Sequence, residues 1–215
     1  MGDSKATPQE EFWSSEFGDQ YSERNVGSDV VASNLAFFAN IFRQISKIDS
    51  VIEYGSNIGL NLMALKLLFP SQNQFAVEIN ESAAKKLQNS MPNVKVFNTA
   101  ISNFDSNQLP AGSCDLALIK GVLIHMNPDQ LSMVYSKLHQ SSHKYILICE
   151  YYNPTPDVVK YRGHSDRLFR RDFAGEMLDQ FEDLTLVNYG FAYHRDPSFP
   201  QDDISWFLLK KLQIK

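Results

Sequence analysis

The stretch that decides the fold is VIEYGSNIG, residues 51–59, an apolar run that ends in a glycine-containing loop. It predicts a short strand over 50–54, then a loop, then a helix over 60–69 that Pro70 ends. Gly55 permits a tight turn, and Gly59 lets the helix pack close to the strand, because neither has a side chain. Asn57 stands where many such loops carry another glycine, and Asn tolerates a positive φ. The stretch therefore predicts a strand–loop–helix unit with a ligand site at the strand's carboxyl end.

Strands and helices alternate on both sides of this unit, with no internal repeat. The run 116–119 is apolar on both faces, as a central parallel strand is. We expect an α/β fold: a doubly wound, mostly parallel sheet that ends in an antiparallel hairpin, with helices on both faces. The expected strands are 50–54, 74–79, 94–97, 116–119, 145–149, 184–189 and 206–209. The expected helices lie near 28–45, 60–69, 80–87, 127–139 and 172–181. Residues 29–215 would form one domain with an irregular insertion at about 150–172, and 1–28 a lid.

Composition narrows the class of protein. The net charge of −5 over 215 residues argues against a nucleic-acid partner. Cys114 and Cys149 lie in apolar runs, which predicts buried, reduced thiols and no metal site. No apolar stretch approaches the ~20 residues of a membrane span, and the start of the chain does not resemble a secretory signal. We expect a cytoplasmic protein with no membrane partner. The sequence carries no signal for an oligomeric state.

Two acidic residues at strand ends favour a nucleoside ligand. Glu78 ends the second strand, where a carboxylate can accept hydrogen bonds from both ribose hydroxyls. Glu53 lies just before the loop, where it would repel a pyrophosphate but could help to hold a cationic amino group. The loop also lacks the G-x-G-x-x-G pattern of a pyrophosphate cradle. These features favour S-adenosylmethionine over NAD as the cofactor, although a tight turn that binds nothing would look similar.

At this point the chain resembles the class I methyltransferases. More narrowly, it resembles the pseudaminic acid biosynthesis-associated methylase family over nearly its whole length. The passages that carry the resemblance are FWSSEFGDQYSERN, VIEYGSNIGLNL, LIKGVLIHMNPDQL, YILICEYYNPTP, YRGHSDRLFRRDFAGEMLDQF and YGFAYHRDPSFPQDDISWFLLKK. The resemblance implies a methyl donor, a sheet that ends in an antiparallel hairpin, and a setting in bacterial nonulosonic-acid glycan synthesis. The family name records an association with that pathway, so the acceptor is an inference.

The resemblance also implies roles for individual residues. Those at the methionine end of the cofactor are Glu53, Gly55, Ser56, Asn57 and Gly59. Glu78 would hold the ribose, with Ile79 beside the adenine. Ala100 and Ile101 fall where the adenine edge is met, although Asn98 and Thr99 replace the usual acidic residue before them. Lys120 and Gly121 would lie beneath the reacting methyl group.

Methyl transfer depends mainly on alignment of the reacting atoms, and a base helps only when the acceptor must lose a proton. His125 is the first candidate base because it follows the fourth strand, although a core histidine would look the same. Glu150 ends the fifth strand and is the second candidate, unless it simply pairs with an arginine. Lys120 could anchor an anionic acceptor, or merely extend to solvent.

The insertion at 150–172 concentrates arginines among aromatic residues, a composition that suits a carboxylate or phosphate ligand. A solvated helix start with salt bridges would look similar. The candidate acceptor residues are Tyr151, Tyr152, Asn153, Tyr161, Arg162, His164, Arg167 and Arg170. In the aromatic-rich segment 12–25 we expect Tyr21 and Arg24 to lie near the methionine carboxylate. Alternatively, Trp13 and Phe17 only cover the sheet edge.

The sequence thus predicts a methyltransferase that acts on a small-molecule or glycan acceptor. One alternative is a DNA amino-methyltransferase, suggested by Asn153-Pro154, but that motif is expected after the fourth strand and here follows the fifth. A second alternative is a protein that binds the cofactor without catalysis as a partner of a glycan-pathway enzyme. A nicotinamide oxidoreductase fits the loop least well.

Overall fold

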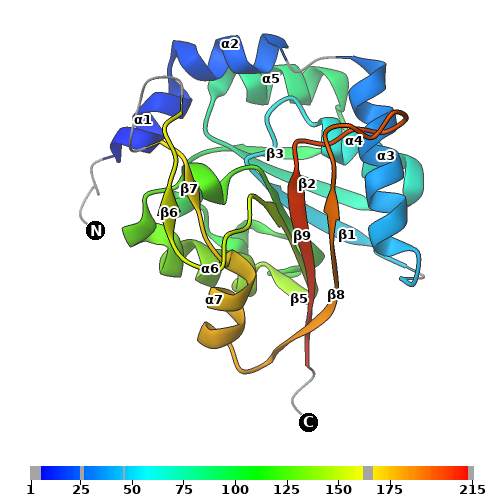
Figure 1. Ribbon diagram of the computed structural model, residues 1–215. Helices are drawn as coiled ribbons and strands as arrows, with labels where there is room; N and C mark the ends of the chain where they lie inside the picture. The colour runs from blue at the N-terminus through cyan, green and yellow to red at the C-terminus, as the bar shows by residue number, and fades with distance from the viewer. Residues whose placement is uncertain (1–5, 25–26, 46, 162–166, 213–215) are drawn as a thin grey trace.

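A computed structural model describes residues 6–24, 27–45, 47–161 and 167–212. A seven-stranded sheet with the strand order β3-β2-β1-β4-β5-β9-β8 runs through the molecule (Figure 1). Strands β3, β2, β1, β4 and β5 are parallel, whereas β9 is antiparallel to both of its neighbours. The strands are β1 Ser50–Tyr54, β2 Asn73–Glu78, β3 Lys95–Asn98, β4 Cys114–Lys120, β5 Ser142–Glu150, β8 Leu184–Ala192 and β9 Ile204–Lys211. The expected fold class, including the closing antiparallel hairpin, is confirmed.

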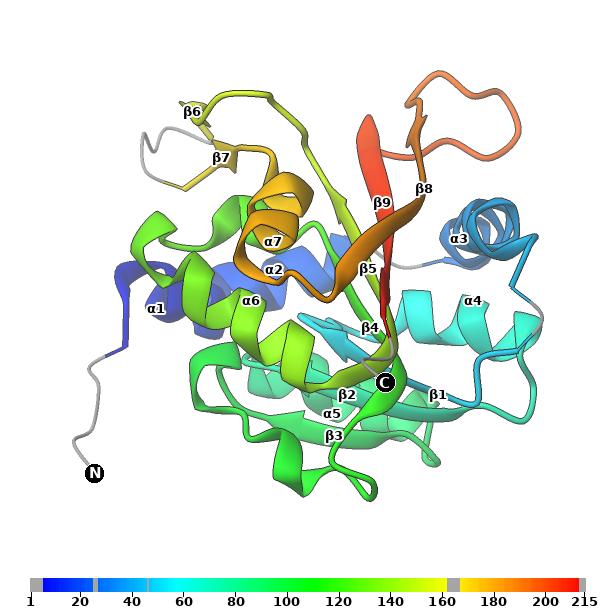
Figure 2. The same cartoon turned by 90° about the horizontal axis from the view of Figure 1, so that it is seen from below.

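Helices cover both faces of the sheet, and each face has its own apolar core (Figure 2). Helices α3 Ser28–Phe42, α4 Leu60–Leu68 and α5 Glu81–Ser90 contribute to one core, and α6 Leu131–Gln140 and α7 Phe173–Gln180 to the other. The central strand β4 is buried along nearly its whole length, as its apolar sequence predicts. Cys114 and Cys149 are free and buried in these cores, as expected. None of the described helices is long and apolar enough to span a membrane.

The strand order places the ends of β1 and β4 side by side. From β1 the chain passes outward to β2 and β3, then returns to form β4 on the other side of β1. Tyr54 pairs with Ile119, so Gly55 and Lys120 follow at the same carboxyl edge. In doubly wound sheets this point, where the strand order reverses, leaves a crevice between the two diverging loops.

The N-terminal segment forms two short helices, α1 Pro8–Ser14 and α2 Glu16–Arg24, where the sequence predicted a lid without regular periodicity. Thr7 begins α1 with a capping box, because its side chain accepts from the Glu10 N–H and the Glu10 carboxylate accepts from the Thr7 N–H. Figure 1 shows α2 lying beside α5, with α1 packed against α2 and farther from α5. The boundary at residue 28 stays a prediction.

The segment after β5 is more ordered than expected. In place of an irregular insertion, it contains a small antiparallel pair, β6 Asp157–Val158 with β7 Phe169–Arg170. The helix expected from 127 begins as a 3₁₀ turn, Pro128–Gln130, before α6. Another 3₁₀ turn, η3 Leu123–His125, follows β4 directly. This turn positions one wall of the site described below.

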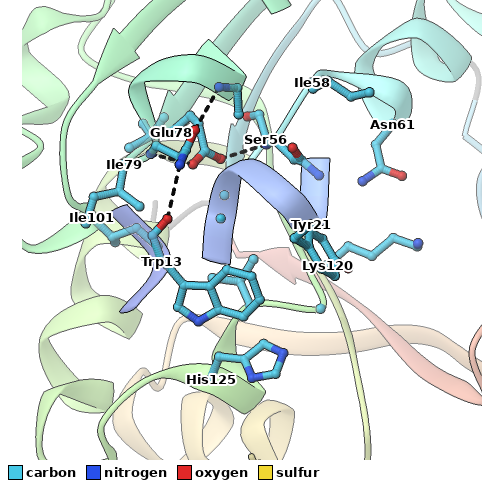
Figure 3. Close-up of a pocket in the computed structure, with 18 of the residues that line it drawn as sticks. Trp13, Tyr21, Ser56, Ile58, Asn61, Glu78, Ile79, Ile101, Lys120 and His125 are labelled. Carbon is cyan, nitrogen blue, oxygen red and sulfur yellow. Dashed lines mark hydrogen bonds between the residues drawn. The ribbon is translucent and has the colours of Figure 1, made fainter. Parts of the chain in front are cut away.

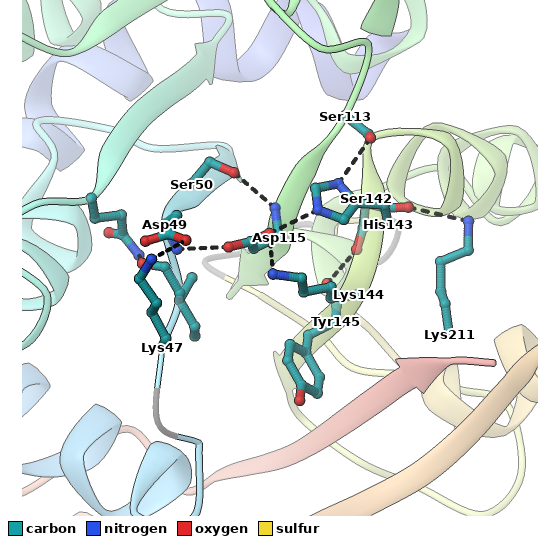
Figure 4. Close-up of polar contacts among 12 residues, drawn as sticks. Lys47, Asp49, Ser50, Ser113, Asp115, Ser142, His143, Lys144, Tyr145 and Lys211 are labelled. Carbon is teal, nitrogen blue, oxygen red and sulfur yellow. Dashed lines mark hydrogen bonds and ion pairs between the residues drawn. The ribbon is translucent and has the colours of Figure 1, made fainter. Parts of the chain in front are cut away.

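The amino ends of three strands are joined by one buried carboxylate (Figure 4). Asp115 is 4% exposed and accepts from the Asp49 N–H at 2.7 Å. Its other oxygen lies 2.7 Å from His143 Nε2 and 2.8 Å from Lys144 Nζ. Burial raises the pKa of Asp115, but the hydrogen bonds from Lys144, Asp49 and His143 outweigh burial and bring the pKa below its ordinary value. The cluster therefore ties β1, β4 and β5 together at the edge opposite the crevice.

Candidate functional site

The loop after β1 adopts the backbone that its sequence allows. Gly55, Asn57 and Gly59 have φ values of 71°, 47° and 85°, all in the left-handed region. The Gly55 N–H donates to the Val77 carbonyl at 2.8 Å, which draws the loop against the end of β2. A Cβ at Gly55 would lie 2.4 Å from Val122 Cγ2, so only glycine fits between this loop and the turn after β4. The loop is held tightly at the strand-order reversal.

Glu78 holds this loop from the end of β2. The residue is 7% exposed, and its two carboxylate oxygens accept from the Asn57 N–H at 2.7 Å and the Asn80 N–H at 2.8 Å. Burial raises the pKa of Glu78, and these backbone hydrogen bonds oppose the rise. A carboxylate oxygen can accept more than one hydrogen bond, so Glu78 keeps acceptor capacity toward the cavity that it lines.

Glu53 lies behind the cavity wall. It is 1% exposed, and its Oε1 accepts from Asn61 Nδ2 at 2.7 Å. Among the described residues, neither Glu53 Oε2 nor Asn61 Oδ1 has a hydrogen-bond partner. Burial raises the pKa of Glu53 to about 8, although the Asn61 hydrogen bond and the nearby Lys120 both lower it. Asn61 lines the cavity and therefore stands between Glu53 and any ligand, a position that the loop motif did not indicate.

A cavity of about 230 Å³ opens over this loop (Figure 3). Among the residues assigned to the cofactor, those that line it are Tyr21, Gly55, Ser56, Asn57, Glu78, Ile79, Ile101, Lys120 and Gly121. Gly59 lies behind the wall, where a Cβ would come 2.9 Å from Leu87 Cγ. Thr99 lines the cavity and Ala100 does not. The backbone of Arg24 ends α2, and its side chain lies outside the described part of the structure. We call this space the donor cavity.

Helices α1 and α2 supply the wall opposite the loop. Trp13, Gly18 and Tyr21 line the donor cavity, together with Thr7, Gln9 and Glu10. Asn80 Nδ2 donates to Asp19 Oδ1 at 3.0 Å, and Ser102 Oγ donates to Glu10 Oε1 at 2.7 Å. These bonds attach both helices to the carboxyl edge of the sheet. Trp13 therefore lines the donor cavity, and its part in cofactor binding stays a prediction.

A second cavity of about 320 Å³ adjoins the first. The residues that line both are Tyr21, Lys120, Gly121, His125 and Asp202. The residues that line only the second are Ile124, Glu150, Tyr151, Tyr161, Leu168 and Ile204. Burial and the nearby Asp202 raise the pKa of Tyr151 to about 12, so this tyrosine keeps its proton. We call the second cavity the acceptor cavity. Asp202, in the connection between β8 and β9, lies in a passage that carries the family resemblance, but the sequence analysis predicted no role for it.

His125 stands where the two cavities meet. Its Nδ1 lies 2.6 Å from the Arg167 carbonyl, which can only accept, so Nδ1 carries the proton and Nε2 keeps its lone pair. The ring packs between Trp13, at 4.8 Å, and Tyr161, at 5.2 Å between centroids. Burial lowers the pKa of His125, although the Arg167 carbonyl opposes this. The imidazole is therefore neutral near pH 7 and can accept a proton.

Glu150 holds the turn that carries His125. It is 2% exposed, and its carboxylate accepts from the backbone N–H groups of Val122 at 2.9 Å, Leu123 at 2.9 Å and Ile124 at 3.4 Å. Burial raises the pKa of Glu150 to about 7, and these three amides oppose the rise. Its partners are thus backbone amides, not an arginine. The geometry suits a positioning residue better than a base.

The described arginines of the insertion do not line either cavity. Arg170 forms an ion pair with Asp157 across β6 and β7, and the Arg167 guanidinium lies 5.6 Å from the centre of the Phe12 ring. Arg171 pairs with Glu176 in the first turn of α7, which matches the salt-bridged helix start considered as the alternative. Arg162 and His164 lie outside the described residues.

Two other candidate acceptor residues also lie away from the cavities. Tyr152 is 42% exposed and packs against Phe207, and Asn153 Nδ2 donates to the Thr155 carbonyl. In the described part of the chain, Tyr151 and Tyr161 are the only predicted acceptor residues that line the acceptor cavity. Among the described residues its wall therefore combines aromatic and aliphatic side chains with carboxylates and Lys120, and the described arginines are not part of it.

Several solved structures that are similar to this chain over nearly its whole length are methyltransferases. The magnesium protoporphyrin IX methyltransferase from Synechocystis, with bound S-adenosylmethionine, is 12% identical and has a TM-score of 0.66 over 97% of this chain and 99% of that one. The 1,6-didemethyltoxoflavin-N1-methyltransferase of Burkholderia thailandensis is 16% identical, with a TM-score of 0.67 over 99% and 94%. A S-adenosylmethionine-dependent methyltransferase from Leishmania major is 13% identical, with a TM-score of 0.69 over 94% and 80%. The chain therefore has the class I methyltransferase fold. No protein-family model and no curated protein matches it.

Proposed function

We propose that this protein is a S-adenosylmethionine-dependent methyltransferase that acts on a small acceptor. The observation that carries the proposal is the junction of two cavities at His125, with the β1 loop and Glu78 on the donor side. Structural neighbours with this fold were solved with S-adenosylmethionine or S-adenosylhomocysteine bound, which supports the same cofactor here.

The donor cavity has the groups that this cofactor needs. Glu78 would accept from the ribose hydroxyls, and Ile79 and Ile101 would pack against the adenine. The free acceptor Asn61 Oδ1, with Glu53 behind it, would receive the methionine ammonium. A buried oxygen without a partner is costly, so its pairing with a cation on binding is favourable. When bound, the cofactor supplies an electrophilic methyl group on a sulfonium.

The protein's own part in the chemistry is alignment and proton transfer. Tyr21, Lys120 and Gly121 form the wall that both cavities share, so an acceptor in one lies next to a donor in the other. His125 Nε2 accepts the proton of an acceptor hydroxyl, and the Arg167 carbonyl holds the resulting imidazolium through Nδ1. Glu150 keeps the turn in place through its three amide contacts.

For the acceptor we propose a nonulosonic acid of the pseudaminic type, either free, activated or linked to a glycan. The family resemblance supports this assignment, and Lys120 offers a cation to the acid's carboxylate at the shared wall. Half-buried tyrosines on the wall suit the ring and hydroxyl groups of a sugar. Because the described arginines lie elsewhere, Lys120 is the anchor we propose among the described residues.

The test has two parts. Isothermal titration should show binding of S-adenosylhomocysteine and none of NAD; tight NAD binding without a response to S-adenosylhomocysteine would refute the cofactor assignment. Mass spectrometry should then detect a methylated product when the protein and donor are incubated with free or CMP-linked nonulosonic acids, with neutral hexoses as the matched control. Donor binding without product from any member of the panel would favour the non-catalytic alternative.

A further inference from the structure

The outer edge of the sheet is formed by β8, a strand of nine residues with the sequence LTLVNYGFA. In the described part of the chain its only sheet partner is β9, so its other side presents backbone donors and acceptors, although the Tyr189 N–H also donates to Asn188 Oδ1 at 3.0 Å. Edge strands of this kind are normally protected by charged residues or proline, because a bare edge pairs with other strands. β8 has neither. A bulge between Leu186 and Asn188 interrupts its first half, which leaves the segment 188–192 regular.

Exposed apolar side chains are concentrated on and just after this strand. Leu186, Val187, Tyr189, Phe191 and Tyr193 are 42%, 42%, 66%, 59% and 47% exposed, respectively. These five make up nearly half of the large exposed hydrophobic residues in the described structure. Exposed apolar residues concentrated in one segment are typical of a binding surface.

The aromatic residues form a row on one face of the sheet. A Cβ at Gly190 would meet the Trp206 ring, so position 190 lies on the face of the sheet that carries Trp206. Because successive strand residues alternate between faces, Tyr189 and Phe191 share the opposite face. Tyr189 stacks on Phe207 with centroids 6.5 Å apart, and Phe207 lies 5.7 Å from Tyr152. We name Tyr152, Phe207, Tyr189 and Phe191 the aromatic row. It runs from the end of β5 outward to the edge strand.

We propose that a second copy of this chain pairs with β8, antiparallel and about a two-fold axis at Gly190. In this register Tyr189 lies opposite the partner subunit's Phe191, and cross-strand aromatic pairs stabilise a sheet. The two-fold joins the aromatic rows of both copies into one continuous surface. It also brings no like charges together, since β8 carries none, so the strand is complementary to itself.

The contact leaves the functional site accessible. None of residues 184–193 lines either cavity in the described structure, and β9 separates β8 from Glu150 and the rest of β5. Pairing at β8 therefore does not depend on the proposed methyltransferase activity. Each can be refuted without the other.

The experiment is light scattering after size-exclusion chromatography of the full chain. We expect a mass twice that of the 24.5 kDa chain. Tyr189→Lys and Phe191→Lys should each give the monomer mass, because a lysine on this edge faces the other copy's aromatic surface. The matched control is Leu67→Lys, since Leu67 is 62% exposed on α4, away from the edge strand, and this variant should remain a dimer. Circular dichroism verifies that each variant is folded.

A cross-link defines the register and does not depend on the lysine variants folding. The double variant Tyr189→Cys/Phe191→Cys should form a covalent dimer under mild oxidation, because directly opposed strand residues lie within disulfide reach. Leu67→Cys should not, and the native Cys114 and Cys149 are buried. A wild-type protein that is monomeric at micromolar concentrations would overturn the proposal. So would a dimer that persists in both lysine variants, or one that the double cysteine variant does not cross-link.

Discussion

Replacing Gly55 with alanine should destabilise the protein and weaken donor binding, and Gly112 provides a matched control. Both glycines have a φ of 71°, so alanine costs about 1–2 kcal/mol at either site from backbone strain alone. At Gly112 no described atom lies within 4 Å of an added Cβ, whereas at Gly55 Val122 Cγ2 lies 2.4 Å away. Overpacking of this kind costs about 1–3 kcal/mol more. The difference between the two variants therefore measures the contact itself.

Thermal unfolding gives the first measurement. At about 2–4 °C for each kcal/mol in a chain of this size, Gly55→Ala should melt about 2–12 °C below Gly112→Ala. Titration with S-adenosylhomocysteine gives the second. Val122 lines the donor cavity, so its displacement should reduce affinity at least about tenfold, equivalent to 1.4 kcal/mol, while Gly112→Ala binds as the wild type does. Equal melting temperatures and equal affinities in the two variants would refute the assignment of this loop.

Three further predictions concern buried ionisable groups. Burial raises the pKa of Glu53 to about 8, so the wild type should lose stability as pH rises from 4.5 through 8, and Glu53→Gln should flatten this dependence in melts across that range. His125→Asn should lower kcat about 10²–10⁴-fold, with a much smaller effect on donor affinity, to which His125 contributes only as one residue of the shared wall. Because burial lowers the pKa of His125, the wild-type rate should rise with pH and reach half of its maximum below the ordinary value of 6.5. A half-maximum above 6.5 would contradict a neutral base. Asp115→Asn should cost about 1–3 kcal/mol in urea unfolding with no change in donor binding. Since the folded-state pKa of Asp115 is lowered, its contribution is present near neutral pH and lost in acid, so the variant should match the wild type at low pH.

Sequence signals predicted those parts of the fold whose backbone conformation is determined by residues close by in the sequence. The residues of 51–59 adopt the predicted strand and loop, with Gly55, Asn57 and Gly59 at positive φ. The buried strand β4 and the helices after it follow from apolar runs and turn residues that act within a few positions. The start of α1 had such a signal too, in the capping-box pattern Thr7 to Glu10, which the sequence analysis did not use.

Local signals could not predict which residues line the site. The strand order brings together residues as far apart in the sequence as Thr7 and Ile204. Asn61 and Asp202 line the cavities although no role was predicted for them, and Arg170 and Arg171, which follow β5 in the predicted anion site, pair with Asp157 and Glu176. An arginine-rich composition does not predict which carboxylates lie close to each arginine, because the packing of β6, β7 and α7 decides those distances. The sequence by itself determined the strand–loop–helix unit and the fold class, through short-range backbone preferences and burial. Only the tertiary structure decided which side chains surround the two cavities, because contacts between distant segments exist only once the sheet has formed.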